Sequence, residues 1–138
     1  MELYQSVRLV RPASVHFFPE DEMGSLFCEK NELEQEGFVL IEGRLPEISK
    51  DRELLEFIAE AMKFPDYFGK NWSALIDCMS DMEWWPAKGY VLVLYGSGKI
   101  WREKPLMIGN FVECWLVCAG RWLERKEPVP FHLVFVFD

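Results

Sequence analysis

The sequence has few of the features that nucleic-acid binding requires. Its 138 residues include 15 Lys and Arg against 23 Asp and Glu, which gives a net charge of −8. A nucleic-acid-binding protein needs a basic surface, and no basic run is visible in the chain. The acidic charge instead favours solubility or a basic protein partner. We therefore expect no nucleic acid among the partners.

Cysteine and histidine are scarce and lack the spacing of ligands. The chain has four cysteines, at positions 28, 78, 114 and 118, without the paired short spacings of a zinc site or a small disulfide scaffold. Those at 78, 114 and 118 fall in helical patterns, which favours buried free thiols. We therefore expect no bound metal and no cofactor.

Targeting and membrane-spanning patterns are also missing. The first four residues carry no positive charge before an apolar stretch, so no secretory signal is predicted. No apolar run approaches the length of a membrane span, and no membrane partner is expected. Together with the unpaired cysteines, these absences favour a reducing cytoplasm.

Patterns of catalysis are weak. A thiol nucleophile could be formed by Cys78 or Cys118 with His132, but no nucleophile motif supports it. Gly96–Lys99 follows a predicted strand as a phosphate loop would. Its spacing is too short, however, and Ile100 stands where Ser or Thr should hold magnesium. We predict a plain turn there, and a protein that is not an enzyme.

What is present is a regular alternation of strands and helices after residue 37. Half of the residues are hydrophobic, which is enough to bury one core. Strands are predicted at 38–42, 90–95 and 131–137, and helices at 49–63, at 71–82 and from Pro105 to before Pro128. This order predicts an α/β domain with a small three-stranded parallel sheet flanked by helices.

The pattern of residues 1–36 differs from that of the rest of the chain. We interpret these residues as an N-terminal extension to a domain at 37–138. Alternating or short apolar runs predict a small β arm, with a turn at 19–24 and a polar connector at 31–37. The strands of this arm are expected at 7–11, 14–18 and 25–29.

The helix at 71–82 has two contrasting faces. Its apolar stripe is Leu75, Cys78, Met79 and Met82, and its other face carries Ser73, Asp77, Ser80 and Asp81. Trp72 and Ile76 border the stripe, and Tyr67 and Phe68 precede the helix in a loop. This combination fits a protein-binding surface, in which aromatic anchors surround a charge. Taken alone, however, it favours a solvated acid beside aromatics that pack under the loop, because most exposed acids form no specific contact.

Residues 64–78 decide between these interpretations, because their sequence resembles the signature of the barstar family of ribonuclease inhibitors. The shared pattern is Pro, acid, two aromatics, Gly, any residue, Asn, any two residues, Ala-Leu, any residue and Asp. The resemblance implies a three-stranded parallel sheet with helices around it, here with an additional N-terminal β arm. It also implies a bacterial immunity protein of a toxin–antitoxin pair, which blocks a ribonuclease-like toxin in a 1:1 complex.

The resemblance further implies roles for individual residues. Asp77 takes the place of a substrate phosphate in the toxin, and Tyr67 packs on the catalytic centre of that enzyme. Gly69 and Asn71 match contacts of the loop and the helix start. The complete set of expected partner-binding residues is Tyr67, Phe68, Gly69, Asn71, Trp72, Ser73, Ile76, Asp77, Ser80 and Asp81.

Departures from the family pattern leave the partner open. Ser73 replaces a second helix acid, Met82 replaces an aromatic, and Glu113 and Glu124 are both out of register with an acid of the later helix. Lys70 adds a cation to the loop that could meet an acid on the partner. The partner is therefore a basic ribonuclease or another nuclease toxin. The alternative is a binding or regulatory module of the same fold for a partner that is not a ribonuclease.

Overall fold

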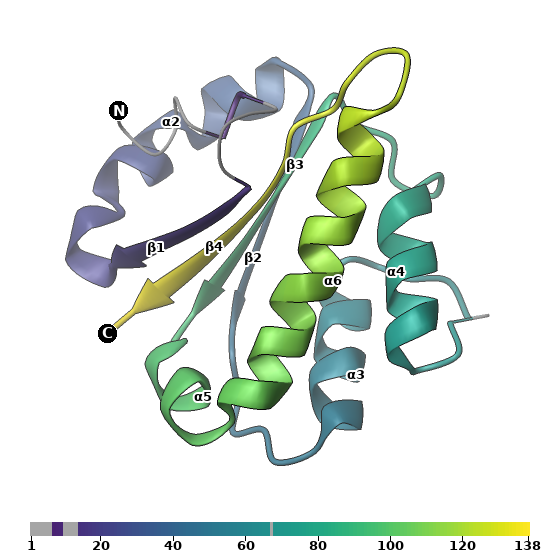
Figure 1. The fold of residues 1–138 in the computed structure, drawn as a ribbon. Coiled ribbons are helices and arrows are strands. Elements are labelled where there is room, and N and C mark those ends of the chain that lie inside the picture. The colour runs from purple at the N-terminus through teal and green to yellow at the C-terminus, as the bar shows by residue number, and fades with distance from the viewer. Residues whose placement is uncertain (1–6, 10–13, 67) are drawn as a thin grey trace.

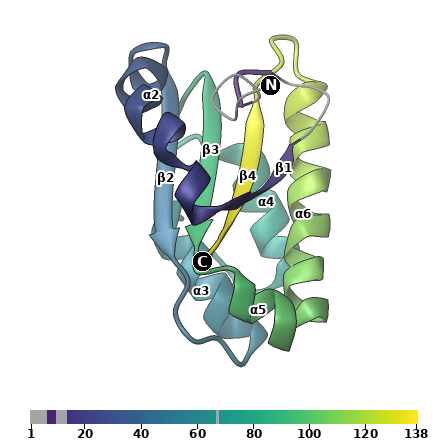
Figure 2. The same cartoon turned by 90° about the vertical axis from the view of Figure 1, so that its left-hand side faces the viewer.

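The computed structural model describes residues 7–9, 14–66 and 68–138, except the side chains of residues 25–28. Its strands form one four-stranded parallel sheet in the order β1-β4-β3-β2 (Figure 2). The strands are β1 (Val15–Pro19), β2 (Phe38–Arg44), β3 (Gly89–Tyr95) and β4 (Phe131–Phe137). The α/β class, the parallel sheet and the strands near 38, 90 and 131 are thus confirmed.

The predicted count of three strands is wrong, because β1 is a fourth strand of the same sheet. Val15 aligns with Leu133 of β4, and the pairing continues in parallel to Pro19 and Phe137. The sequence predicts this segment as part of a separate β arm, because its local pattern does not show which strand it will pair with. With β1 in place, β4 is an interior strand and is buried over nearly its whole length.

Helices cover both faces of the sheet (Figure 1). Helix α2 (Gly24–Gln35) lies on one face, and α3 (Asp51–Ala61), α4 (Trp72–Asp81) and α6 (Pro105–Leu123) lie on the other. The short 3₁₀ helix η1 (Glu20–Glu22) and helix α5 (Gly98–Glu103) complete the described elements. Alternate residues of the central strands serve two cores, so that Leu133 packs toward α6 while Val134 packs with Leu33 of α2.

Three predictions about the N-terminal extension are corrected by these elements. The segment 25–29 is helical rather than a strand, and α2 also takes up most of the predicted connector at 31–37. Of the predicted strand at 7–11, Val7 and Arg8 form a turn, and residues 10 and 11 lie outside the described residues. The helix is only weakly amphipathic, so its formation depends on docking to the open sheet face rather than on local pattern.

The start of α3 also differs by one residue from its prediction. The N-cap is Lys50, whereas Ser49 was expected there. The Ser49 backbone N–H and hydroxyl instead donate to Glu53 Oε1, at 3.3 and 2.9 Å. These bonds, with one from the Lys50 N–H, lower the pKa of the Glu53 carboxyl and hold it at the helix N-terminus.

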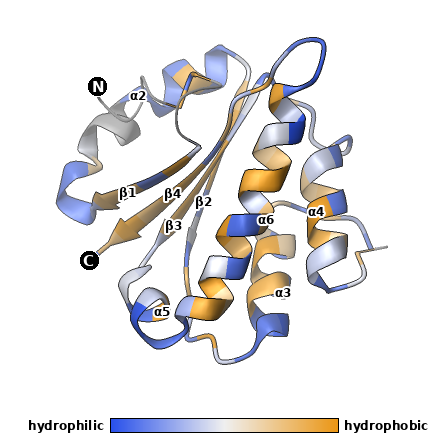
Figure 3. Cartoon of the chain, viewed as in Figure 1, coloured by the Kyte–Doolittle hydropathy of each residue, from blue (hydrophilic) through white to orange (hydrophobic). Residues whose placement is uncertain are grey.

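Helix α6 is the central apolar helix of the larger core (Figure 3). By length and composition it is the one helix among the described residues that could cross a membrane, which sequence reading had not anticipated. Its buried residues are Met107, Ile108, Phe111, Cys114, Trp115, Cys118 and Trp122. These side chains pack on the sheet and on α4, so the core accounts for part of the apolar character of α6, while Leu106, Leu116 and Val117 of the same helix are exposed.

Two histidines connect β1 to β4 on the face covered by α2. His16 Nε2 lies 2.8 Å from His132 Nδ1, and the other ring nitrogen of His132 contacts the carbonyl oxygen of Leu9. Burial, and then the neighbouring His132, lowers the pKa of His16 to about 4. Burial also lowers the pKa of His132, which is fully buried. The pair is therefore neutral at pH 7.

We expect the free energy of unfolding to decrease as the pH falls from about 6.5 toward 4. The unfolded chain protonates His16 near its ordinary value of 6.5, whereas the folded chain resists protonation until about pH 4. The loss is about 2 kcal/mol, less than the full shift because the ring is partly exposed. Urea unfolding at several pH values measures it.

The matched control is His16→Gln, which can still hydrogen-bond to His132 but does not titrate. Carboxylates titrate equally in both proteins, so the difference between the two stability curves isolates His16. Parallel curves between pH 6.5 and 4.5 would contradict the assignment.

Candidate functional site

Two residues in the left-handed region lie at the ends of the loop 64–71: Lys63, at φ 58°, precedes it, and Lys70, at φ 55°, is its last residue but one. Non-glycine residues seldom adopt this conformation, and they often accompany functional loops. Inside the loop, the Phe64 N–H donates to the Ala59 carbonyl at 2.8 Å, and the Phe68 N–H donates to the Pro65 carbonyl at 3.1 Å. These two bonds hold the backbone at Phe64 and at Phe68, on either side of residue 67.

Aromatic side chains fix the underside of the loop. Phe68 is 9% exposed and packs edge-on against Phe64, whose ring in turn meets Trp84. Phe68 was predicted among the partner-binding residues, but its ring faces the core, so it supports the loop from below. Tyr67, the other predicted aromatic contact, lies outside the described residues.

Contacts to α3 hold the end of the loop. The Lys70 ammonium lies 3.5 Å from the Glu56 carboxylate, so the loop cation predicted to meet a partner's acid is already paired. Gly69 is exposed, and the Trp72 indole N–H donates to Asp51 Oδ2 at 3.1 Å. The start of α4 is therefore tied to the start of α3.

The two faces predicted for α4 are largely confirmed. Leu75, Cys78, Met79 and Met82 are buried, while Ser73, Asp77 and Asp81 are exposed and Trp72 and Ile76 are partly buried. No Lys or Arg of the described residues forms an ion pair with Asp77. Its carboxylate is therefore presented to solvent, without a cation of its own to compete with a partner.

Ser80 lies elsewhere than predicted. It was expected on the outer face, but it is partly buried against α6, where its hydroxyl donates to Cys118 Sγ at 3.4 Å. The same oxygen accepts a hydrogen bond from Arg121 at 3.2 Å. A helical wheel of α4 alone cannot show that a neighbouring helix covers this side.

Sequence reasoning missed Arg121 and Arg125, which flank the end of α4. Arg125 lies over the Trp122 ring, with its guanidinium carbon 3.3 Å from the ring centre, and donates to the Ser80 carbonyl. The Trp122 indole N–H donates to the Met79 carbonyl at 2.8 Å. These donors satisfy carbonyls in the last turn of α4, where helices lack internal partners. Arg121 lies in the last turn of α6 and Arg125 lies beyond its end, so helical spacing in the sequence gave no signal that both would reach α4.

The buried thiols do not form a catalytic centre. Burial raises the pKa of Cys78 to about 11, with a further contribution from Asp77 and Asp81, and burial raises that of Cys118 to the same value. Both are therefore protonated at neutral pH and poorly nucleophilic. His132 contacts His16 and Leu9 rather than either thiol. Among the described residues, no group of three or more His, Cys, Asp or Glu side chains could hold a metal ion.

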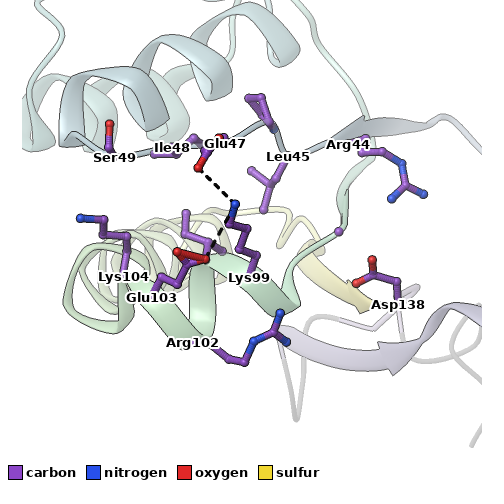
Figure 4. A pocket seen from close by; sticks show the side chains of 13 residues that line it. Arg44, Leu45, Glu47, Ile48, Ser49, Lys99, Arg102, Glu103, Lys104 and Asp138 are labelled. Carbon is purple, nitrogen blue, oxygen red and sulfur yellow. Dashed lines mark hydrogen bonds and ion pairs between the residues drawn. The ribbon is translucent and has the colours of Figure 1, made fainter.

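A separate cavity of about 570 Å³ lies where the strands β2, β3 and β4 end (Figure 4). Lys99 projects into it and is held by Glu47 at 3.1 Å and Glu103 at 3.9 Å. In the Gly96–Lys99 segment that borders the cavity, only Gly96 and Ser97 form the predicted turn, because Gly98 and Lys99 begin α5. The buried Ser97 hydroxyl donates to the Leu94 carbonyl at 2.6 Å. The Lys99 ammonium is paired with the Glu47 and Glu103 carboxylates, so this segment does not offer a free cation to a phosphate group.

Comparison with known proteins gives one match. The family model described as Barstar (barnase inhibitor) matches residues 38–136, which include β2 to β4, the loop 64–71 and helices α3 to α6. No curated protein and no solved structure matches the chain. Residues 1–37, with β1 and α2, precede the matched region.

Asn71→Ala should lower the free energy of unfolding by about 1 kcal/mol, because Asn71 is the N-cap of α4. Its side-chain oxygen accepts a hydrogen bond from the Ala74 N–H at 2.8 Å. Urea unfolding tests this, with Asn71→Ser as the control that keeps a capping oxygen. Equal unfolding midpoints for the Ala and Ser variants would show that the cap contributes nothing.

Proposed function

Because the chain belongs to the barstar family of barnase inhibitors, we propose that it is an intracellular immunity protein against a basic ribonuclease-like toxin. In this proposal the chain forms a 1:1 complex and closes the toxin's active site with α4 and the loop 64–71. The family acts by inhibition rather than catalysis, and we expect this chain to have no enzymatic activity of its own.

The observation that carries the proposal is the position of Asp77. This carboxylate is exposed on α4, nearly two helical turns after the N-cap Asn71, and has no ion-pair partner among the described residues. A ribonuclease grips the phosphate of RNA with Arg, Lys and His side chains. A carboxylate at the same point receives the same charge-assisted hydrogen bonds, often two from one Arg.

The surroundings of Asp77 fit a tight protein contact. The small, exposed Ser73 lies one helical turn before it, and the partly buried Ile76 adds apolar area. In the proposed complex, such an arrangement excludes water from the pair formed by Asp77 and a cation of the toxin. Burial of a charge is favourable only when its partner is present. The proposed direct contacts are Tyr67, Gly69, Asn71, Trp72, Ser73, Ile76, Asp77, Ser80 and Asp81, while Phe68 supports the loop.

The net charge of −8 supports the same partner. An acidic protein attracts a basic toxin over a distance of about 8 Å at physiological salt, which speeds the encounter. Speed matters for a protein that must capture a nuclease before it cuts cytoplasmic RNA.

We expect Asp77→Ala to weaken binding of the toxin by at least about 2 kcal/mol, the size of an interface hot spot, and to leave the fold intact. The measurement is calorimetric titration with a basic ribonuclease of the barnase type, in parallel with the loss of RNA cleavage. Circular dichroism and urea unfolding verify the fold.

The matched control is Asp21→Ala, which removes an equally exposed aspartate from η1, before α2 on the opposite face of the sheet. It changes the net charge by the same amount but should retain full affinity. A loss below about 1 kcal/mol for Asp77→Ala would remove Asp77 from the interface. A complex that forms without loss of RNA cleavage would instead support a regulatory module for another kind of partner.

A further inference from the structure

Arg121 of α6 is joined to α4 by one hydrogen bond to Ser80. Its guanidinium donates to Ser80 Oγ at 3.2 Å, and that hydroxyl in turn donates to Cys118 Sγ at 3.4 Å. Ser80 lies one helical turn after Asp77, so the cation borders the same surface as the carboxylate. The surface therefore contains an acid and a fixed cation side by side.

Arg121 is not used by the protein itself as an ion-pair partner. The chain contains 23 acidic residues, yet no described Asp or Glu lies within ion-pair distance of Arg121. The described residues accept one hydrogen bond from it, whereas a guanidinium has five N–H donors. Arg125, by contrast, is engaged in stacking on Trp122 and in bonding the Ser80 carbonyl. Arg121 thus keeps a charge and most of its donors available.

The surface continues along α6 from Arg121 toward the start of the helix. Glu113, Val117 and Arg121 are spaced by four and lie in one stripe of the helix. Val117 is 42% exposed, and Cys118 next to it donates to the Ile76 carbonyl of α4 at 3.5 Å. Apolar groups from both helices therefore lie between Asp77 and the outer part of α6, as expected for an interface that spans both.

We infer that Arg121 determines which ribonuclease the protein accepts, by binding a carboxylate at the rim of the partner's basic cleft. This inference rests on the proposed function. A guanidinium held in place matches a carboxylate with two parallel hydrogen bonds and loses little conformational entropy on binding. The same guanidinium repels a partner whose rim is basic at that point, so it excludes such ribonucleases. RNA is a poor ligand here, because Asp77 and Asp81 lie beside the cation.

The test uses a basic ribonuclease of the barnase type that binds the protein and loses affinity for the Asp77→Ala variant. We expect Arg121→Gln to weaken this complex about tenfold and Arg121→Glu about a hundredfold. Arg102→Gln, which neutralises an exposed arginine of α5 outside the proposed surface, should leave the affinity unchanged. Urea unfolding of each variant verifies the fold.

A charge exchange separates recognition from a merely structural role. Changing the facing carboxylate of the ribonuclease to Lys should weaken binding to the natural protein and restore binding to the Arg121→Glu variant. A structural effect of Arg121 would not be rescued by the partner.

Unchanged or tighter binding by Arg121→Glu would overturn the inference, and so would the absence of rescue by every acid-to-Lys change at the rim. If Asp77→Ala still weakens the complex in that case, the proposed function stands and only the role of Arg121 falls. If Asp77→Ala has no effect on any ribonuclease tested, the proposed function itself fails.

Discussion

The packing of α4 against α6 determines which part of α4 a partner can reach. Leu75, Cys78 and Met79 are buried below the helix, and the Trp122 indole N–H holds the Met79 carbonyl from the side of α6. With two sides of the helix covered, only the side that carries Ser73 and Asp77 remains open. The orientation of one carboxylate is thus a consequence of core packing, which is rigid compared with a surface loop.

The same packing gives the surface its mixed charge. Ser80 is drawn against α6 and orients Arg121, so a cation borders the acid face of α4. An inhibitor that relied only on negative charge would attract many basic proteins. In the proposed complex, Arg121 beside the acid adds a requirement on the partner, in the way that specific interfaces combine attraction with repulsion.

The N-terminal extension completes the sheet on the side remote from this surface. Strand β1 pairs with β4, and α2 covers the valines that face away from α6. Arg8 is joined to the end of α2 by hydrogen bonds to Glu36, at 2.9, 3.2 and 2.7 Å. Since His16 and His132 meet within this layer, the extension and the region matched by the family share one sheet and one buried hydrogen-bond network.

The sequence by itself determined the strands and helices whose apolar period is strong. The continuous runs of β2, β3 and β4, the stripe of α4 and the motif at 64–78 were sufficient for the α/β class, the family and the outward position of Asp77. These features are local, because residues within one element carry the whole signal. Tertiary structure decided the rest: the pairing of β1 with β4, the helical state of 25–29, the inward turn of Phe68 and the contact of Ser80 with α6. Each of these depends on which residues pack against the segment in the folded protein. The sequence pattern of the segment itself does not show which residues those are.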